Sequence, residues 1–517
     1  MVRFNQEDNM KLFNDQNLLI GLISLLPVLL FISLFDNKLS IGLGLLAVLS
    51  YITFFIFSKF GLKDKKIYLL FFIVLVIHIS ATLFMYYANF QPFSGGDGDY
   101  VVYQKSAVEF SQSFRQGEFS LKNIATEYPG IILGHYYPII VGAVYALTTP
   151  AEIIGLLLNV WLATIAVVLT YLIVLEVGGT WKSAFLVGLL VAIYPSYLFM
   201  TSLLLKEAIE IFFVLLGLLF IIKTIKNFSW KNFIVLYLAL ICATHFRFYI
   251  GYALIAAFVL SWVLFSNIEI KKRLIYGVIF IALLGFIPQV AADQGYCGIN
   301  SFKAYLNFHM VNFYRKLAYT PVLPLDSNSS PNSTVNNTTN NASNITGSIG
   351  NDTVSNSTDT NPTGSILIDS DLTDTASAIG VGSSFVAENT VWGYAKSFIY
   401  VLFGPFPWQI KNIRQSSALV ETIPWYILLF FIVDGIIIAF RKKIKEVAPL
   451  LIFSIMAMAV MAIFNSNFGI IVRIRIPAFI SLLCIASLSL NNMKFIDDIF
   501  SKAEDIFNRS ISKLANL

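Results

Sequence analysis

The sequence has little charge and few cysteines, and each shortage excludes a class of protein. Of its 517 residues, 13% are charged and 57% are hydrophobic, whereas soluble globular chains carry about 25% charged and about 45–50% apolar residues. With a mean hydropathy of +0.74, this is not the composition of a soluble globular protein. The formal net charge of +5 is too small and too dispersed for a nucleic-acid-binding surface, so we expect no nucleic acid partner. The three cysteines lie far apart and form neither a disulfide framework nor a Cys/His zinc motif.

Long apolar runs are what the sequence has instead. A helix needs roughly 20 apolar residues to cross the hydrocarbon core of a bilayer, and about twelve runs approach that length. The sequence therefore predicts an all-α fold, a polytopic membrane helix bundle of about 12 transmembrane helices, with the lipid bilayer as a partner. The predicted spans are 17–35, 40–58, 67–88, 151–177, 182–200, 207–223, 232–247, 250–266, 274–291, 424–440, 447–465 and 475–490.

The basic residues predict the orientation of these spans. Lysine and arginine clusters follow the second, sixth, eighth and tenth runs, and the positive-inside rule places such clusters in the cytoplasm. Both termini are then cytoplasmic, and the chain is predicted to be a multi-pass protein of the cell membrane. The longest external loop is 292–391. Its Asn/Ser/Thr-rich insert, 326–364, holds several N-x-S/T glycosylation acceptor sequences and is predicted to be disordered.

Two further apolar segments do not fit the alternation of basic loops. A span at either 131–149 or 392–410 would place every later basic cluster outside, so we expect external interfacial or re-entrant helices there. The predicted organisation is then 1–66, a cytoplasmic segment with two extra transmembrane helices; 67–291, a transmembrane core with the first external loop at 89–150; 292–391, the external loop; 392–423, an external re-entrant or interfacial segment; 424–490, the C-terminal transmembrane helices; and 491–517, a cytoplasmic tail.

Acidic residues on the external side are candidate functional groups, because charges near lipid are costly to keep. Asp97 and Asp99 lie in the Gly-rich loop after the third run, and a helix beginning at Asp99 would carry Tyr103 at i+4. The alternative is that Asp99 only caps that helix. Lys206 and Glu207 lie between the fifth and sixth runs, where the carboxylate could face Asp99 across a water-filled cavity. The alternative there is a boundary pair whose lysine extends to the membrane surface.

Basic residues on the same side are candidates for holding a phosphate. His245 and Arg247 lie in the short turn between the seventh and eighth runs, where the alternative is interfacial anchoring. Arg473 and Arg475 precede the last run, against the positive-inside bias. Their side chains point the same way if the segment is extended and opposite ways if it is helical. Arg414 lies in an external Pro/Trp-rich turn, where anchoring and substrate contact are equally supported.

The order of these motifs resembles the C-type (GT-C) superfamily of polytopic membrane glycosyltransferases, which includes protein O-mannosyltransferases and aminoarabinose transferases. The pattern G-D-x-x-x-Y-x-x-x-A, from Gly98 to Ala107, is similar to the first external loop of that family. It is followed by the apolar segment HYYPIIVGAVYAL and by YPSYLFMTSLLLKEAIEIFF, which is similar to the second acidic site of the family. The recognisable order covers residues 67–225.

The resemblance implies an inverting glycosyltransferase that moves a sugar from a dolichyl- or undecaprenyl-type polyprenyl phosphate to a hydroxyl of a glycan, lipid or protein acceptor. It implies Asp99 as the general base, with Asp97 as its substitute, and Glu207 as the second acidic residue. It leaves open a divalent cation, Mg²⁺ or Mn²⁺, held by these three carboxylates. We further expect the substrate to contact Tyr103, Lys206, His245, Arg247, Arg414, Arg473 and Arg475.

Two other functions stay open. An O-antigen-like polymerase or ligase also uses lipid-linked donors and external arginines, and the Arg473-x-Arg475 pair fits it well. A lipid-linked oligosaccharide flippase or another secondary transporter would also have many helices, but transporters usually show repeated halves and polar helices near mid-membrane. The acidic first loop favours the transferase of single sugars.

Overall fold

The structure of this protein is a computed structural model. It describes residues 25–62, 64–89, 99–117, 136–292, 296–307, 311, 390–404, 406, 408, 419–464, 468–491, 493 and 501. The predicted disordered insert 326–364 and both chain ends lie outside these residues.

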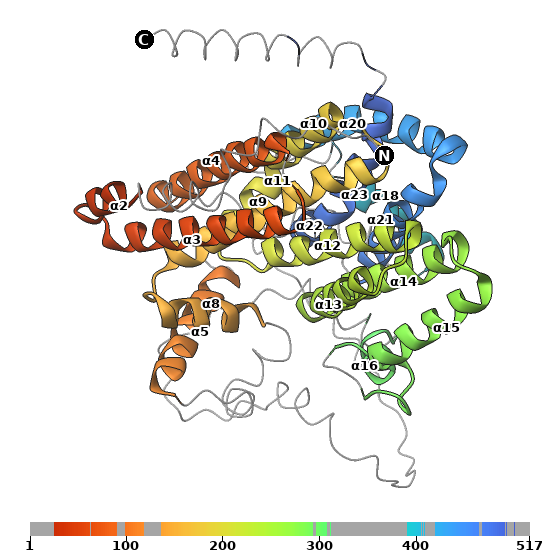
Figure 1. Cartoon of the computed structure of the whole chain (residues 1–517), viewed down its shortest axis with the longest axis horizontal. Helices are drawn as coiled ribbons and strands as arrows, with labels where there is room; N and C mark the ends of the chain where they lie inside the picture. The colour runs from red at the N-terminus through yellow and green to blue at the C-terminus, as the bar shows by residue number, and fades with distance from the viewer. Residues whose placement is uncertain are drawn as a thin grey trace, which may run out of the picture.

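Every regular element of the described residues is helical, and no β-strand occurs among them (Figure 1). The elements in chain order are α2 (Leu26–Ser33), α3 (Asn37–Lys59), α4 (Lys65–Ala88), α5 (Asp99–Gln116), α8 (Tyr137–Leu147), α9 (Glu152–Glu176), α10 (Trp181–Ala192), α11 (Pro195–Thr201), α12 (Glu207–Lys226), α13 (Trp230–Phe246), α14 (Phe248–Phe265), α15 (Ile270–Ile281), the π-helical η1 (Ala282–Phe286), α16 (Ile299–Tyr305), α18 (Val391–Phe403), α20 (Leu419–Lys442), α21 (Ile444–Phe464), α22 (Phe468–Ile474) and α23 (Ile476–Leu490).

Short polar side chains fix where several of these helices begin. The Asp36 carboxylate accepts a hydrogen bond from the backbone N–H of Leu39 at 3.0 Å, three residues into α3. Thr180 and Thr390 act in the same way at α10 and α18. Such caps satisfy backbone donors that the first helical turn leaves without partners.

Seven of the described helices are long and apolar enough to cross a membrane, or eight if α10 and α11, which meet at a bend of 61°, form one broken span. The chain is therefore a polytopic helical membrane protein. Other predicted runs also form helices, but these are shorter: α13 has 17 residues, α23 has 15 and α15 has 12. The count of about twelve crossings stays a prediction.

Helix α9 lies at the centre of the bundle. It packs against α3, α4, α10 and α12, and 94% of its apolar window is buried inside the protein. A helix that is hydrophobic on all sides is expected in such a position. Only 22% of the window of α20 is buried, and exposed Ile, Val and Phe side chains cover its outer face. That face is suited to contact with lipid.

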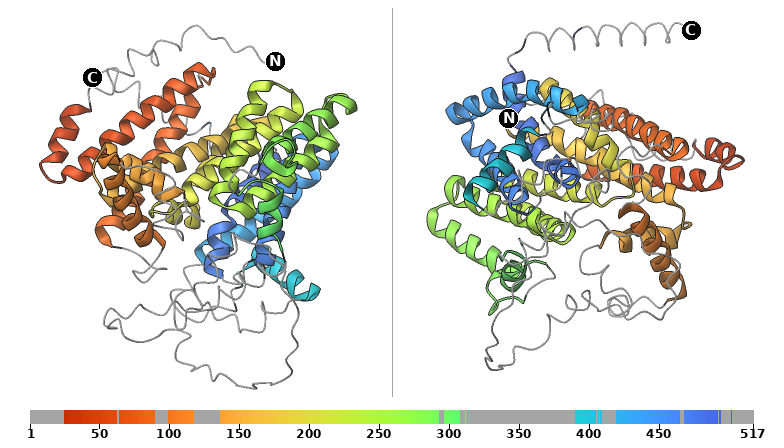
Figure 2. Two further views of the ribbon diagram at one scale, coloured as in Figure 1. Left: turned by 90° about the horizontal axis from the view of Figure 1, so that it is seen from below. Right: turned by 180° about the vertical axis from the view of Figure 1, so that it is seen from behind.

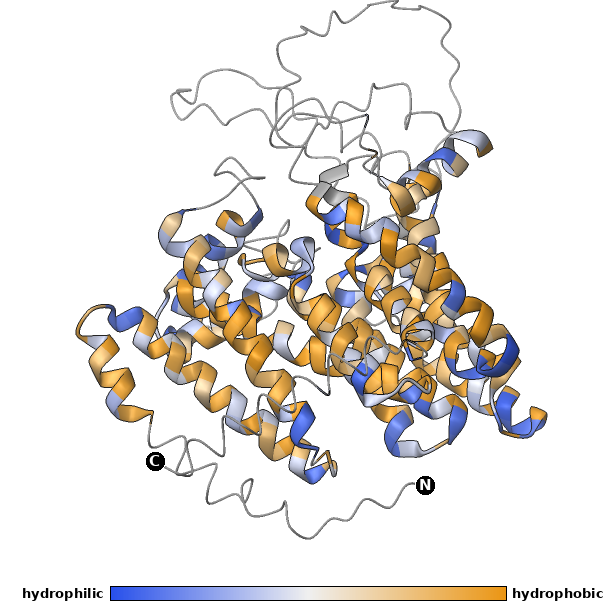
Figure 3. Ribbon diagram, turned by 90° about the horizontal axis from the view of Figure 1, so that it is seen from above, coloured by the Kyte–Doolittle hydropathy of each residue, from blue (hydrophilic) through white to orange (hydrophobic). Residues whose placement is uncertain are grey.

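The helix ends that the basic residues assign to one side of the membrane also lie together in the structure. Lys226, at the end of α12, pairs with Glu176, at the end of α9, at 2.8 Å. Asn267 accepts a hydrogen bond from Lys445 at 3.3 Å and donates one to the carbonyl of Lys226 at 3.0 Å. Figure 3 shows hydrophobic residues along the helices and hydrophilic ones mainly at their ends. The relative sidedness of these ends therefore agrees with the sequence.

At the opposite end, α5 and α8 form a pair beside the bundle (Figures 1 and 2). Arg115 of α5 donates to the backbone carbonyls of Tyr145 and Thr148 at 2.9 Å each. The Tyr145 hydroxyl donates to Gln104 of α5 at 2.6 Å. With 11 residues in α8 and 13 in α18, neither helix reaches the length of a candidate span. The described parts of segments 131–149 and 392–410 thus hold short helices.

Helices α20 and α23 approach each other closely at Gly435. A Cβ atom at this glycine would lie 2.4 Å from the carbonyl oxygen of Ile485. The approach lets the neighbouring Asp434 accept a hydrogen bond from Ser489 of α23 at 2.6 Å. A buried polar group inside the bundle is stabilised by such a partner.

We expect Gly435→Val to destabilise the α20–α23 contact, because the new side chain must push backbone apart; overpacking of this kind typically costs about 1–3 kcal/mol. The measurement is the midpoint of thermal unfolding in detergent. Val433→Leu, at a position on the same helix with 56% exposure, is the control and should leave the midpoint unchanged. Equal midpoints for the two variants would contradict the close packing.

Candidate functional site

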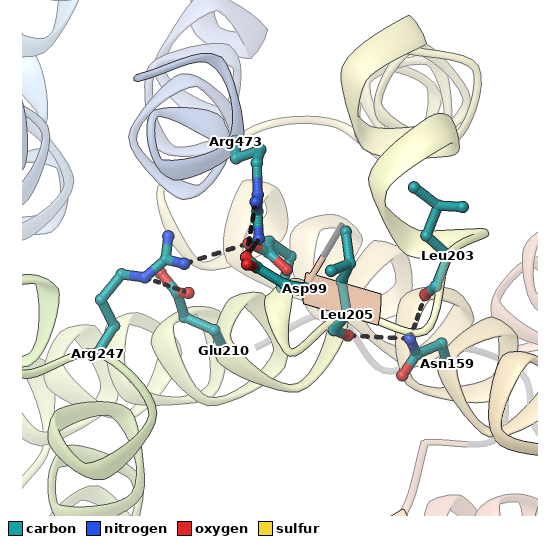
Figure 4. A network of polar contacts seen from close by, with 8 residues as sticks. Asp99, Asn159, Leu203, Leu205, Glu210, Arg247 and Arg473 are labelled. Atoms are coloured by element: carbon teal, nitrogen blue, oxygen red, sulfur yellow. Dashed lines mark hydrogen bonds and ion pairs between the residues drawn. The ribbon is translucent and has the colours of Figure 1, made fainter. Parts of the chain in front are cut away.

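Four helix ends bring charged residues together at the end of the bundle that carries α5 and α8. Asp99 begins α5, and Glu207 begins α12. Arg247 stands between α13 and α14, and Arg473 lies near the end of α22. Figure 4 shows the side chains of Asp99, Glu210, Arg247 and Arg473 converging, and we call these residues, with Lys206 and Glu207, the charge cluster.

Arg473 joins the two carboxylates that the sequence analysis singled out. Its Nη1 and Nη2 atoms each donate to Asp99 Oδ2 at 3.0 Å. Its Nε atom donates to Glu207 Oε1 at 2.9 Å, and Nη2 lies 2.8 Å from the same oxygen. The Asp99 side chain is 56% exposed and that of Glu207 is 1% exposed. One arginine thus links a solvent-facing carboxylate to a buried one.

Arg247 supplies the second cation of the charge cluster. Its Nη2 atom donates to Glu207 Oε1 at 3.1 Å, and its Nε atom lies 3.2 Å from Glu210 Oε2. Glu210 is one helical turn after Glu207, so both carboxylates lie on the same face of α12. A buried carboxylate is stable only when it is paired, and Glu207 is paired with two guanidinium groups.

Several buried atoms of the charge cluster keep unused hydrogen-bonding capacity. Within the part of the chain that the structure describes, Glu207 Oε2, Glu210 Oε1 and Arg247 Nη1 have no hydrogen-bond partner. Buried polar atoms of folded proteins are nearly always partnered by protein, water or a ligand. This site therefore has both donor and acceptor capacity for a polar ligand.

The charges of the cluster act on the neighbouring groups. Burial disfavours the charged form of Arg473, but the carboxylates of Glu207 and Asp99 raise its pKa above the ordinary value, so it stays a cation. Burial, reinforced by the charges of Glu207 and Asp99, raises the pKa of Tyr103, so its hydroxyl keeps its proton. Burial and the nearby charge of Arg247 lower the pKa of the Lys206 ammonium.

A hydrogen-bond chain through α9 positions both sides of the site. The buried amide of Asn159 donates to the carbonyls of Leu203 and Leu205 at 2.7 and 3.0 Å (Figure 4). Its oxygen accepts from the Tyr137 hydroxyl of α8 at 2.9 Å. The ring of Tyr137 packs edge-on against that of Tyr103 at 5.6 Å. Asn159 thus connects the segment leading into α12 to the helix pair that carries Asp99.

Arg475 does not join the charge cluster. It pairs with Glu421 of α20 at 2.8 Å and donates to the carbonyl of Gly404 at 2.6 Å. Glu421 also accepts hydrogen bonds from Tyr194 and Ser196, on the bend between α10 and α11. Because the segment is helical around Arg473, the two arginines point in different directions.

The remaining predicted site residues fall into three groups. Tyr103 is buried beside the charge cluster, and Lys206 is a buried member of it. His245 forms no ion pair among the residues described; its Nδ1 atom lies 2.8 Å from the carbonyl of Ile241. Asp97 and Arg414 lie outside the described residues.

A metal held by Asp97, Asp99 and Glu207 finds no support in the described part of the site. No group of three His, Cys, Asp or Glu side chains there could hold a metal ion. Asp99 and Glu207 both contact Arg473, whose guanidinium lies where a bridging cation would be held. The two carboxylates do not fit a shared metal in this arrangement, and we derive no step through one.

Two residues of the site were given no chemical role from the sequence. Glu210 is a second acid one turn beyond Glu207, and Asn159 is an amide within an otherwise apolar run. A polar residue inside a membrane helix is a functional signal in itself, so both residues could have been chosen as candidates from the sequence. Nothing in the sequence indicated that Tyr137 would be the partner of Asn159.

Comparison of the chain with models of known families, with curated proteins and with solved structures finds no match. The assignment of a function therefore depends on the geometry of the charge cluster.

We expect Asn159→Leu to lower the midpoint of thermal unfolding, because the carbonyls of Leu203 and Leu205 lose their donor. Leaving a buried polar group without a partner costs about 1–3 kcal/mol. Thr170→Val is the matched control on the same helix, since among the described residues the Thr170 hydroxyl bonds within α9, to the Ala166 carbonyl. If both variants shift the midpoint equally, Asn159 does not connect the elements as described.

Proposed function

We propose that the protein is an integral-membrane glycosyltransferase. It transfers a sugar from a polyprenyl-phosphate donor to an acceptor hydroxyl at the external face of the membrane. The observation that carries the proposal is the pairing of Asp99 with Arg473 across a sequence separation of 374 residues. This brings a base for the acceptor next to a cation for the donor phosphate.

Asp99 has the properties that a general base needs. Its carboxylate is paired with Arg473, and its 56% exposure leaves it accessible to an acceptor hydroxyl. Asp99 would take the proton of that hydroxyl as the hydroxyl oxygen bonds to the anomeric carbon of the sugar. The bond from that carbon to the phosphate oxygen breaks on the opposite face, so the configuration inverts. Proton transfer of this kind contributes about 10²–10⁴-fold to a rate.

The arginines would stabilise the departing phosphate. Arg473 and Arg247 present guanidinium groups, which bind phosphate oxygens through paired hydrogen bonds. Both are held in place by Glu207 before any substrate arrives. Donors fixed in advance where negative charge develops are an effective source of catalysis.

The geometry favours this proposal over the two alternatives. The case for an O-antigen-like polymerase or ligase used Arg473 and Arg475 together, but Arg475 is paired with Glu421 away from the charge cluster. A flippase needs polar groups that follow a path through the membrane. The cluster lies instead at one end of the bundle, where α5, α12 and α22 meet (Figure 4).

We expect Asp99→Asn to lower the transfer rate at least about 100-fold, because the amide cannot accept the acceptor proton. The measurement is turnover by purified protein with a polyprenyl-phosphate sugar, chosen after mass spectrometry of the lipids that copurify. Glu109→Gln, which removes a carboxylate from the same helix ten residues away, is the control and should keep its activity. Wild-type turnover by Asp99→Asn would remove Asp99 from the mechanism.

The external location of the charge cluster is part of the proposal. We expect a cysteine at Val391, the 88% exposed first residue of α18, to react with a membrane-impermeant maleimide in intact cells. A cysteine at Lys272, whose side chain is 59% exposed at the other end of the bundle, should react only after permeabilisation. The parent chain, whose Cys242 is half-buried, gives the background. The reverse labelling pattern would invert the orientation.

A further inference from the structure

Arg473 is shared between two carboxylates of unequal burial. Glu207 is 1% exposed and Asp99 is 56% exposed. An ion pair that water reaches is worth little, whereas breaking a buried pair leaves an uncompensated charge. The contact of Arg473 with Asp99 is therefore the weaker of its two links and the one that an incoming anion can replace.

The charge cluster has as many carboxylates as cationic side chains. Its carboxylates are Asp99, Glu207 and Glu210, and its cations are Lys206, Arg247 and Arg473. The three negative and three positive groups balance. A phosphate entering this site adds negative charge, so it gains most where it takes over a guanidinium from a carboxylate that can move into water. Asp99 is the only carboxylate of the three with an exposed side chain.

We propose that a phosphate group binds Arg473 in place of Asp99, so that binding of the lipid-phosphate donor releases the base. This inference rests on the proposed function and adds an order of events to it. Before the donor binds, both Nη atoms of Arg473 donate to Asp99 Oδ2, and the carboxylate is engaged. Once phosphate occupies those donors, Asp99 is free to accept the proton of the hydroxyl. Asp99 thus stays paired with Arg473 until the donor binds.

Arg473 is suited to such an exchange because a second contact keeps it in place. Its Nε atom donates to Glu207 Oε1 at 2.9 Å, on the edge of the guanidinium away from the Nη1 atom that faces Asp99. Loss of Asp99 leaves this contact unchanged. Arg247 Nη1, which has no partner among the described residues, adds a further donor for the same anion.

The test is a double-mutant cycle on phosphate binding. The probe is undecaprenyl phosphate, titrated in detergent onto the wild-type chain, Asp99→Asn, Arg473→Gln and the double variant. We expect Asp99→Asn to bind about fivefold more tightly than wild type, because a competing exposed ion pair is gone. We expect Arg473→Gln to bind more weakly. In the Arg473→Gln background, Asp99→Asn should bring no gain, since the two sites are coupled.

Two outcomes overturn the inference. Unchanged or weaker binding by Asp99→Asn means that Asp99 does not compete with phosphate. An equal gain in the Arg473→Gln background means that Asp99 only repels the anion at a distance. Glu109→Gln, with the same loss of charge on the same helix, reports that long-range effect and should bind as wild type does.

Inorganic phosphate in place of the lipid distinguishes the source of the anion. If it displaces undecaprenyl phosphate, and does so at lower concentration from Asp99→Asn, the phosphate group itself is recognised, as proposed. If it does not compete at any concentration, binding depends on the isoprenoid and the exchange at Arg473 is wrong. Failure here is distinct from failure of the proposed function, which is decided by the transfer rate of Asp99→Asn. Monodisperse elution and an unchanged unfolding midpoint establish that each variant is folded.

Discussion

The burial of the Glu207 carboxylate is the constraint on which the rest of the site depends. An ionised carboxylate inside an apolar bundle is stable only when its charge is compensated. The compensation comes from Arg247 and Arg473, at 3.1 and 2.8 Å. These two arginines belong to elements far apart in the chain, the α13–α14 turn and α22. Their pairing with one oxygen atom fixes where both elements lie against the start of α12.

The same constraint keeps Arg473 beside Asp99. If Arg473 left Glu207, the buried carboxylate would lose one of its two cationic partners. Arg473 therefore stays at the surface, where Asp99 also lies. Asp99 reaches that position through α5, which is held to α8, and α8 is connected by Tyr137 to Asn159 in the buried helix α9. A buried helix at the centre of the bundle thus determines the placement of an exposed carboxylate at the start of α5. A site supported in this way keeps a fixed geometry, which the proposed transfer reaction requires.

Much of this could be predicted from the sequence, because long apolar runs and basic clusters are strong local signals. The helix starting at Asp99, with Tyr103 four residues on, was predicted from the sequence, and the structure confirms it; the burial of Tyr103 is seen only in the structure. The number of spans was not decidable, since it depends on where helices end, and α10 and α11 meet at a bend of 61° before Pro195. The choice between Arg473 and Arg475 also depended on backbone conformation. Residues at positions i and i+2, such as these two arginines, are about 200° apart around a helix, but they share a face in a strand.

Arg475 explains why Arg473 stays where it is. Their segment could turn about its axis and present either arginine to Glu207. Arg475 is 2% exposed and paired with Glu421 at 2.8 Å, and Glu421 is held in turn by Tyr194 and Ser196. Rotation of α22 would break this buried pair, which is strongly unfavourable. Two buried acids, Glu207 paired with Arg473 and Glu421 paired with Arg475, therefore set the rotation of the segment. The ion pair between Arg475 and Glu421, on the opposite side of this helix end, thus determines that Arg473 is the arginine that faces Asp99.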